Sequence, residues 1–399
     1  MSDKRNKAAD LRGLTRLLKE ATLGVTDVVE AMHRRIVHPP FLPSTDIQHL
    51  ITDIAGFTYK NIKWSTRLIG GGLDRLLGRL TPLINEGKTS TQRERIRAVL
   101  NGVLGDHLEA TDNPLQIKMI VRCESEYLEL RQEKRTEISG AVNGKILLMI
   151  HGSCMNERQW TRKGHNHGLA LAQELDKTAL FLHYNSGRHI SSNGQDLSAL
   201  LEDLVRHWPV PPEEIVILGH SMGGLVARSA VHYAREEQKD WPRHLKKMVF
   251  LGTPHQGALL ERSGNYLDVL LDKIHYTRPL ARLGKIRSAG VTDLRYGSLL
   301  DEDWQDKDRF DLAAYGQSTV PLPREVDCYS IAAVKNKGTK LEMLQGDGLV
   351  GLKSALGQHK DAKRDLQFEE RNTWIAYGNG HLDLLNDPSV YAKIQSWLD

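Results

Sequence analysis

Cysteine is scarce in this chain of 399 residues, which contains Cys123, Cys154 and Cys328 and no Cys-x-x-Cys spacing. A sparse, odd-numbered set excludes a disulfide framework or a cysteine-rich zinc site as the basis of the fold, and it favours a reducing compartment. Long apolar runs are also missing, since no stretch approaches the roughly 20 residues that span a bilayer. The first 14 residues lack the apolar core of a secretory signal. We therefore expect a cytoplasmic protein.

Charge of one sign is not concentrated either, and the net charge is +4. Residues 1–115 contain 17 Lys and Arg against 13 Asp and Glu, whereas residues 116–399 contain 37 of each. The lack of a dense basic stripe argues against a nucleic-acid-binding surface. The mildly basic first part leaves weak attraction to an anionic membrane open. With 40% apolar and 26% charged residues the composition is globular, and the length favours two units.

The first part of the chain has the apolar spacing of helices. This spacing recurs over residues 8–37, 44–63 and 68–80, and another helix is expected over 90–109. Prolines in the run 38–43 end the first helix, because proline cannot continue it. Turn-forming residues at 111–114 mark a boundary. We predict an all-helical N-terminal region over residues 1–115 and a second domain over 116–399.

Residues 59–83 interleave basic and aromatic residues with leucines. One interpretation is an interfacial segment that gives the protein peripheral membrane contact through its N-terminal helices. Another is a helical hairpin packed on the second domain or over its cleft. An arm that binds another protein is a third interpretation.

From residue 116 onward, short apolar strands alternate with helices. This alternation predicts an α/β fold with a mostly parallel central sheet flanked by helices. The long interruption at 257–322 contains helical pieces at 266–274 and 280–286, and we expect it to form a helical cap or lid. Strands are expected at 117–121, 127–131, 146–150, 179–183, 215–218, 248–251, 329–334 and 374–377, and helices at 166–175, 195–207, 223–237 and 387–398.

The strongest motif is Gly219-His220-Ser221-Met222-Gly223, which follows a predicted strand and precedes a predicted helix. This is the G-x-S-x-G nucleophile elbow in the context that it requires. The chain must reverse sharply at the serine, so side chains at 219 and 223 would collide. The pattern predicts Ser221 as a nucleophile, with a helix N-terminus behind it that favours negative charge.

A serine nucleophile needs a base and an acid that orients it, and in such folds these follow in the order Asp or Glu, then His. His381 lies in Gly378-Asn379-Gly380-His381, directly after the last predicted strand, and is the candidate base. For the acid, Asp347 lies between glycines after the strand 329–334 and is favoured over Glu342, which lies in a lysine-flanked stretch. His165 and His167 have no carboxylate at ligand spacing, so we expect solvated loop residues and no metal site.

Two backbone amides should stabilise the oxyanion. One is that of Met222, directly after the nucleophile. The other should come from the loop His151-Gly152-Ser153-Cys154 after the strand 146–150, where Ser153 is the favoured donor and Cys154 the alternative. Nothing marks a basic partner for Cys154, so it is not expected to be a nucleophile.

Residues 116–399 resemble the α/β-hydrolase superfamily, and within it the lipase and esterase group close to the PGAP1-like hydrolases. The matching segments, in order, are His151-Gly152, the elbow at 219–224, Leu251-Gly252-Thr253-Pro254-His255-Gln256-Gly257-Ala258, Gly346-Asp347-Gly348-Leu349-Val350 and His381-Leu382-Asp383-Leu384-Leu385. The resemblance implies Ser221 as nucleophile, Asp347 as acid and His381 as base. The residues Ser-Cys-Met after His-Gly depart from the bulky apolar residue of many lipases, which leaves the acyl-chain preference open.

These residues predict a serine hydrolase that cleaves a small-molecule or lipid carboxylic ester through an acyl-enzyme, with no metal or organic cofactor. An acyltransferase or thioesterase would use the same three residues, because the acyl-enzyme is common to all of them. A non-catalytic interaction protein on the same fold is the alternative from another class, since fold alone does not decide function.

Overall fold

The computed structural model describes residues 12–13, 15–16, 90–123, 126–127, 142–258, 288–307, 318–335 and 346–399. Most of the predicted N-terminal helices, the segment 59–83, the helical pieces at 266–286 and Glu342 lie outside these residues. The chain divides into two compact units, Met1–Ile96 with Asp112–Leu115, and Arg97–Thr111 with Gln116–Asp399. In the first, the Asn113 amide donates to the Gly13 carbonyl at 3.1 Å. The functions predicted for residues 1–115 stay predictions.

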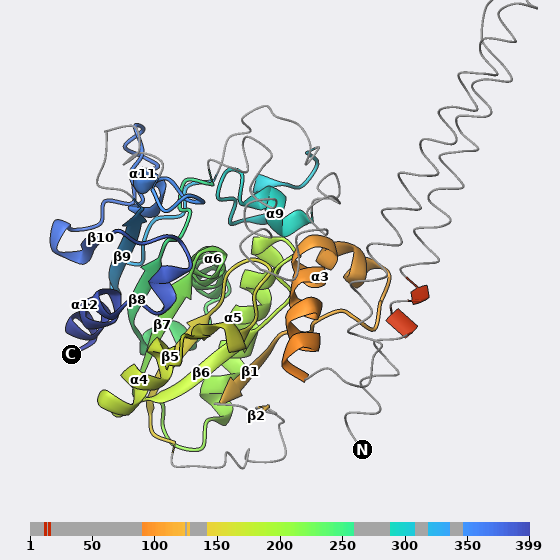
Figure 1. Ribbon diagram of the computed structural model, residues 1–399, viewed down its shortest axis with the longest axis horizontal. Helices are drawn as coiled ribbons and strands as arrows, with labels where there is room; N and C mark the ends of the chain where they lie inside the picture. Colours follow the sequence, from red (N-terminus) through yellow and green to blue (C-terminus); the bar gives the residue numbers. More distant parts are fainter. Residues whose placement is uncertain are drawn as a thin grey trace, which may run out of the picture. The chain divides into compact units, whose positions relative to one another are not determined.

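Eight strands of the described residues form one sheet in the order β10-β9-β8-β7-β3-β6-β1-β2 (Figure 1). The six strands from β10 to β6 are parallel, and β1 and β2 are antiparallel at one edge. This confirms the predicted fold class. The strands are β1 (Ile120–Cys123), β2 (Glu126–Tyr127), β3 (Lys145–Ile150), β6 (Thr178–His183), β7 (Glu214–His220), β8 (Leu245–Leu251), β9 (Asp327–Val334) and β10 (Thr373–Tyr377), and β4 (Thr161–Arg162) and β5 (His165–Asn166) form a separate hairpin.

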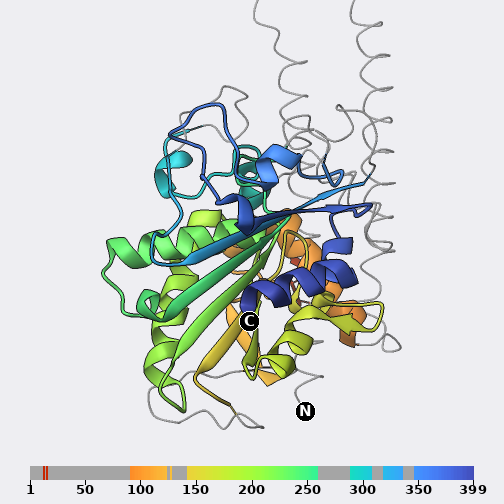
Figure 2. The ribbon, with the colours of Figure 1, turned by 90° about the vertical axis from the view of Figure 1, so that its left-hand side faces the viewer.

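Helices cover both faces of the sheet, with α5 and α6 on one face and α4 and α12 on the other (Figure 2). The central strands are apolar throughout because both of their faces are buried. No helix of the described ranges is long and apolar enough to cross a membrane. The helices are α3 (Ser90–Ala110), α4 (His167–Glu174), α5 (Ile190–His207), α6 (Met222–Glu236), α9 (Ala289–Asp293), α11 (Leu352–Ala355) and α12 (Pro388–Leu398), with short 3-10 turns η1 (Glu157–Trp160), η2 (Trp241–His244), η4 (Asp301–Asp303), η5 (Glu370–Asn372) and η6 (Asp383–Leu385).

The side chains of one sheet face alternate with those of the other along each strand. Leu147 and Met149 of β3, with Val216 and Leu218 of β7, belong to the core shared with α4 and α12. The intervening residues of the same strands are equally buried. Each fully buried Leu, Ile or Val side chain stabilises the fold by about 1.5–3 kcal/mol relative to an exposed one. This double-sided core fixes the carboxyl ends of the parallel strands, where ligands bind in open α/β sheets.

A buried charge cluster holds the segment that follows β3. Glu157 in η1 forms an ion pair with Arg122 of β1, and its other oxygen accepts a hydrogen bond from His183 Nδ1 of β6 at 2.6 Å. Burial alone would raise the pKa of the Glu157 carboxyl, but the hydrogen bond and electrostatic effect of His183 and the charge of Arg122 lower it to about 2. The cluster therefore ties η1 to the antiparallel edge of the sheet.

The described part of the long insertion, residues 288–307, is attached to the sheet domain. The Ala258 amide, near the start of the insertion, donates to the Leu294 carbonyl at 2.7 Å. Ser288, the N-cap of α9, donates to the Gly102 carbonyl of α3 at 2.7 Å, and Asp106 of the same helix accepts from the Ala289 amide at 3.0 Å. The strands β8 and β9 are direct neighbours despite the insertion between them, as the sequence predicts.

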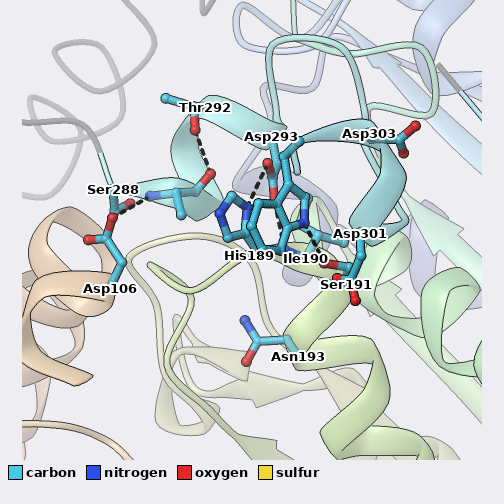
Figure 3. Close-up of polar contacts among 12 residues, drawn as sticks. Asp106, His189, Ile190, Ser191, Asn193, Ser288, Thr292, Asp293, Asp301 and Asp303 are labelled. Atoms are coloured by element: carbon cyan, nitrogen blue, oxygen red, sulfur yellow. Dashed lines mark hydrogen bonds and ion pairs between the residues drawn. The ribbon is translucent and has the colours of Figure 1, made fainter. Parts of the chain in front are cut away.

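Asp293 connects this segment to the start of α5, as Figure 3 shows. Its carboxylate accepts from the Ile190 amide at 2.8 Å and from His189 Nδ1 at 3.1 Å. The His189 ring stacks on Trp304 at 3.7 Å between ring centroids, and Trp304 Nε1 donates to Ser191 Oγ at 2.9 Å. Burial raises the pKa of Asp293. These contacts seat residues 288–307 on the N-terminal turn of α5.

Replacing Glu157 with Gln should destabilise the protein by about 3 kcal/mol at pH 7, because it removes the buried negative charge opposite Arg122. A lowered carboxyl pKa gives stability that is complete above the ordinary pKa of 4.5 and is lost as the pH falls towards about 2. The difference between wild type and variant should therefore shrink between pH 5 and pH 3, measured as the free energy of unfolding in urea. Glu369→Gln, at an exposed ion pair with Arg371, is the control. A difference in unfolding free energy between wild type and Glu157→Gln that does not change with pH would contradict the lowered pKa of Glu157.

Replacing Asp293 with Ala should cost about 2 kcal/mol of unfolding free energy, because the buried Ile190 amide loses its acceptor. Asp293→Asn keeps an oxygen acceptor and should cost less. Urea unfolding followed by circular dichroism measures both variants, with the exposed Asp240→Ala as control. An Ala variant as stable as the control would show that the carboxylate does not hold this segment.

Candidate active site

Ser221 follows the last residue of β7 and is the N-cap of α6, so strand, turn and helix are arranged as predicted. Its backbone has φ 54° and ψ −124°, a conformation that non-glycine residues adopt rarely. Such strain costs about 1–3 kcal/mol and persists only where the surroundings enforce it. Here the Ser221 amide donates to the Leu251 carbonyl of β8 at 2.9 Å, and the residue is buried.

Two glycines of the elbow leave no room for a side chain. A Cβ at Gly219 would lie 2.8 Å from the Gly224 Cα, and a Cβ at Gly223 would lie 2.3 Å from the Ile150 carbonyl oxygen. Both separations are shorter than real Cβ contacts. The collision predicted for side chains at these two positions is therefore confirmed, and its cause is the close approach of α6 to the backbone of β3 and β7.

Asp347 and His381 are in direct contact although 34 residues separate them. His381 Nδ1 donates to Asp347 Oδ2 at 2.6 Å, and both side chains are buried. The other oxygen, Oδ1, accepts from the amides of Leu349 and Val350 at 2.8 Å each. The carboxylate is thus fixed by its own turn, and it sets the imidazole tautomer, with Nδ1 protonated and Nε2 free to accept.

Gly252 makes room for the His381–Asp347 pair, a role that was not predicted from the sequence. It follows β8 with φ 57°, and a Cβ there would lie 3.1 Å from His381 Nδ1 and 3.2 Å from Asp347 Oδ2. The signal in the sequence was its place in the Leu-Gly-Thr-Pro-His segment, directly after a buried strand. A glycine is required here both by the positive φ and by the close approach.

His220 is a second residue that the prediction missed. Its Nε2 donates to the His381 carbonyl at 3.1 Å, and the two rings lie 4.7 Å apart between centroids. Burial and the neighbouring His381 lower the pKa of His220 well below its ordinary value. An uncharged His220 therefore connects His381 to the elbow, because it precedes Ser221 directly in the chain.

The segment after β3 lies against the elbow serine. A Cβ at Gly152 would lie 3.0 Å from the Ser221 Cβ, so only a glycine permits this approach. His151 stacks on Tyr184 at 4.3 Å between ring centroids, and burial lowers the pKa of His151 to about 4. The Tyr184 hydroxyl donates to the His151 carbonyl at 2.8 Å. These contacts fix the main chain beside Ser221.

The two candidate oxyanion donors of this segment differ in their hydrogen bonds. The Cys154 amide donates to Ser186 Oγ at 3.0 Å, so it is already engaged, and Ser153 is favoured over it. Burial raises the pKa of the Cys154 thiol to about 12, which keeps it a thiol and agrees with the expectation that it is not a nucleophile. The roles of Ser153 and Met222 as oxyanion donors stay predictions.

His167 corrects the prediction of solvated loop histidines. It is buried at the start of α4, its Nε2 lies 3.1 Å from the Leu384 carbonyl, and its Nδ1 lies 2.8 Å from His165 Nε2. Burial lowers the pKa of His167 to about 4. The pair is therefore part of the packing between α4 and the segment before α12. Within the described ranges, no group of three His, Cys, Asp or Glu side chains could hold a metal ion.

Two reactive atoms at this edge of the sheet have no hydrogen-bond partner among the described residues. They are Ser221 Oγ and His381 Nε2, and both are buried. Buried polar atoms without a partner are uncommon and mark groups reserved for other contacts. An unengaged hydroxyl, an imidazole with a free acceptor nitrogen and a carboxylate that orients it can together carry out nucleophilic acyl chemistry.

Comparisons with known proteins give a family match and several similar solved structures. Residues 141–319 match the family model described as a PGAP1-like alpha/beta domain. Similar solved structures include the mature lipase BlEst2 of Bacillus licheniformis, with 16% identity and a TM-score of 0.42 over 65% of this chain and 95% of that chain. Another is the esterase Pf2001 of Pyrococcus furiosus, with 13% identity and a TM-score of 0.39 over 64% and 80% of the two chains. A third is an alpha/beta hydrolase fold protein from Chitinophaga pinensis, with 12% identity and a TM-score of 0.36 over 65% and 91%.

A comparison with curated proteins gives no match. The assignment therefore depends on the strand order, on the elbow at the end of β7 and on the match of residues 141–319. On these observations the chain has an α/β-hydrolase fold, and its residues 141–319 are similar to a PGAP1-like alpha/beta domain.

Proposed function

We propose that this protein is a serine hydrolase that cleaves carboxylic esters through an acyl-enzyme on Ser221. The observation that carries the proposal is the buried hydrogen bond between His381 Nδ1 and Asp347 Oδ2, which leaves His381 Nε2 as a free acceptor beside the elbow. In this arrangement Ser221 is the nucleophile, His381 the base and Asp347 the acid that orients it.

The reaction begins when His381 Nε2 takes the proton of Ser221 Oγ as that oxygen attacks the ester carbonyl carbon. The amides of Met222 and Ser153 stabilise the negative charge on the carbonyl oxygen, an effect of roughly 3–4 kcal/mol for each donor. Asp347 stabilises the imidazolium form of His381 and stays ionised. The tetrahedral intermediate then collapses, and His381 gives its proton to the departing alcohol oxygen.

Water completes the cycle by the same steps. His381 removes a proton from water, the hydroxide oxygen attacks the acyl carbon, and the bond to Ser221 Oγ breaks as that oxygen regains a proton. A carboxylic ester of a small molecule or a lipid suits this set of groups, because its alcohol leaves readily once protonated. Transfer of the acyl group to another alcohol, or cleavage of a thioester, would use the same acyl-enzyme and is an outcome of the test below.

The first test is hydrolysis of p-nitrophenyl esters with acyl chains from acetate to palmitate. Ser221→Ala should lower kcat at least about a thousandfold, because no acyl-enzyme can form. Ser396→Ala, on the exposed side of α12, is the control and should retain wild-type turnover. Folded protein that is inactive at every chain length would overturn the proposal, as would activity that survives in Ser221→Ala. Turnover that requires an added alcohol acceptor would identify an acyltransferase instead.

Gly252→Ala should lower kcat about tenfold or more, with a smaller effect on KM, because the added Cβ would displace the His381–Asp347 pair. Gly378→Ala is a matched control, since Gly378 also has a positive φ but has no atom within 4 Å of a Cβ built there. Both variants introduce backbone strain, and only the first disturbs the pair. Equal activity losses in the two variants would mean that strain, and not displacement of the pair, is the cause.

A further inference from the structure

A buried arginine of α6 has no acidic partner among the described residues. Arg228 lies two turns after Ser221 and is 5% exposed. Its guanidinium donates to the Val320 carbonyl and contacts His255, but its Nε has no hydrogen-bond partner, and no carboxylate of the described residues forms an ion pair with it. Burial lowers the pKa of Arg228 to about 10, which leaves it charged at neutral pH. Buried charges are costly unless an opposite charge accompanies them.

His255 adds a second unengaged donor next to Arg228. Arg228 NH1 lies 3.3 Å from His255 Nδ1, so that nitrogen accepts and Nε2 carries the proton. His255 Nε2 has no hydrogen-bond partner in the described part of the chain, and the residue is buried. Burial and the charge of Arg228 lower the pKa of His255 well below its ordinary value, so the ring is a neutral donor. Two buried donors, one of them charged, therefore lie side by side.

Both residues line a small pocket of about 30 Å³ that is partly open to solvent, here called the Arg228 pocket. Its polar lining also includes Arg364, Ser318, Thr319 and Tyr296, while Leu299, Val320 and Leu366 form apolar walls. No Asp or Glu is among these lining residues, and neither are Ser221, Asp347 or His381. The buried Asp303 accepts from the amides of Ser318 at 2.7 Å and Leu299 at 2.9 Å, and the exposed Glu302 accepts from Ser318 Oγ at 3.2 Å. The described lining thus combines two arginines with hydroxyl groups, and neither of these carboxylates forms an ion pair with Arg228.

We propose that the Arg228 pocket binds a small oxyanion, a phosphate or carboxylate group, with Arg228 supplying the opposite charge. An oxyanion in the pocket would supply the negative charge that Arg228 lacks among the described residues, and charge-assisted hydrogen bonds from a guanidinium are among the strongest in proteins. The pocket is formed by α6, the segment after β8 and residues 318–320 at the end of the insertion. A bound anion would therefore join the helix that begins at Ser221 to the end of the insertion.

The competing explanation is that Arg228 serves only to hold the Val320 carbonyl. Thermal unfolding and calorimetric titration distinguish this structural role from anion binding. Inorganic phosphate and acetate are the probes, chloride is the reference anion, and the ionic strength is held constant. Wild type should bind one of the two probes saturably and unfold at a higher temperature in its presence. Phosphate and acetate together distinguish a phosphate-bearing ligand from a carboxylate-bearing one. Binding is measured without an ester, so its failure is independent of the proposed hydrolase activity.

Arg228→Met should weaken binding of that probe at least about tenfold, because it keeps the length of the side chain and removes its charge. Arg235→Met is the matched control, since Arg235 lies two turns further along α6 with an exposed side chain paired to Glu325. It should bind as wild type does. Should Arg228→Met fail to fold, His255→Gln tests the second donor and should weaken binding by a smaller factor. Absence of saturable binding in wild type, or equal binding by wild type and Arg228→Met, would overturn the proposal.

Discussion

The close approach of α6 to the sheet determines the geometry of the candidate site. A Cβ at Gly223 would lie 2.3 Å from the Ile150 carbonyl oxygen of β3, and a Cβ at Gly224 would lie 2.1 Å from Thr253 Oγ1, so both glycines are needed for this close packing. This contact, with the hydrogen bond from the Ser221 amide to Leu251, keeps Ser221 at φ 54°. The strain of about 1–3 kcal/mol is small beside the burial of the apolar strands on either side.

Uncharged histidines surround the proposed base. His151 and His220 both have lowered pKa values because they are buried, and His220 lies in ring contact with His381. A positive charge on His220 would oppose the charge that His381 would acquire in the proposed reaction. The neutral ring instead donates one hydrogen bond to the His381 carbonyl and fixes that residue's main chain. Asp347 then supplies the one opposite charge that the imidazolium needs.

The local sequence pattern was sufficient to predict the candidate site residues that follow strand ends. Ser221, Asp347 and His381 were located from a strand and a glycine-bordered turn, and the parallel sheet brings such turns to one edge. Contacts that depend on distant packing were not predictable. His167 is buried because its Nε2 meets a carbonyl 217 residues away, and His220 contacts a residue 161 positions later. Likewise, nothing near Arg228 in the sequence indicates that it forms no ion pair with the acidic residues that the structure describes.

The hydrogen bond between the Ala258 amide and the Leu294 carbonyl has a consequence for how this fold can diverge. Because the two sides of the insertion are joined at its base, and β8 and β9 pair directly, the sheet does not depend on the length of the chain between them. Doubling the length of such a loop costs only about 0.6 kcal/mol in closure entropy. This segment can therefore change in length while the carboxyl edge of the sheet keeps its geometry.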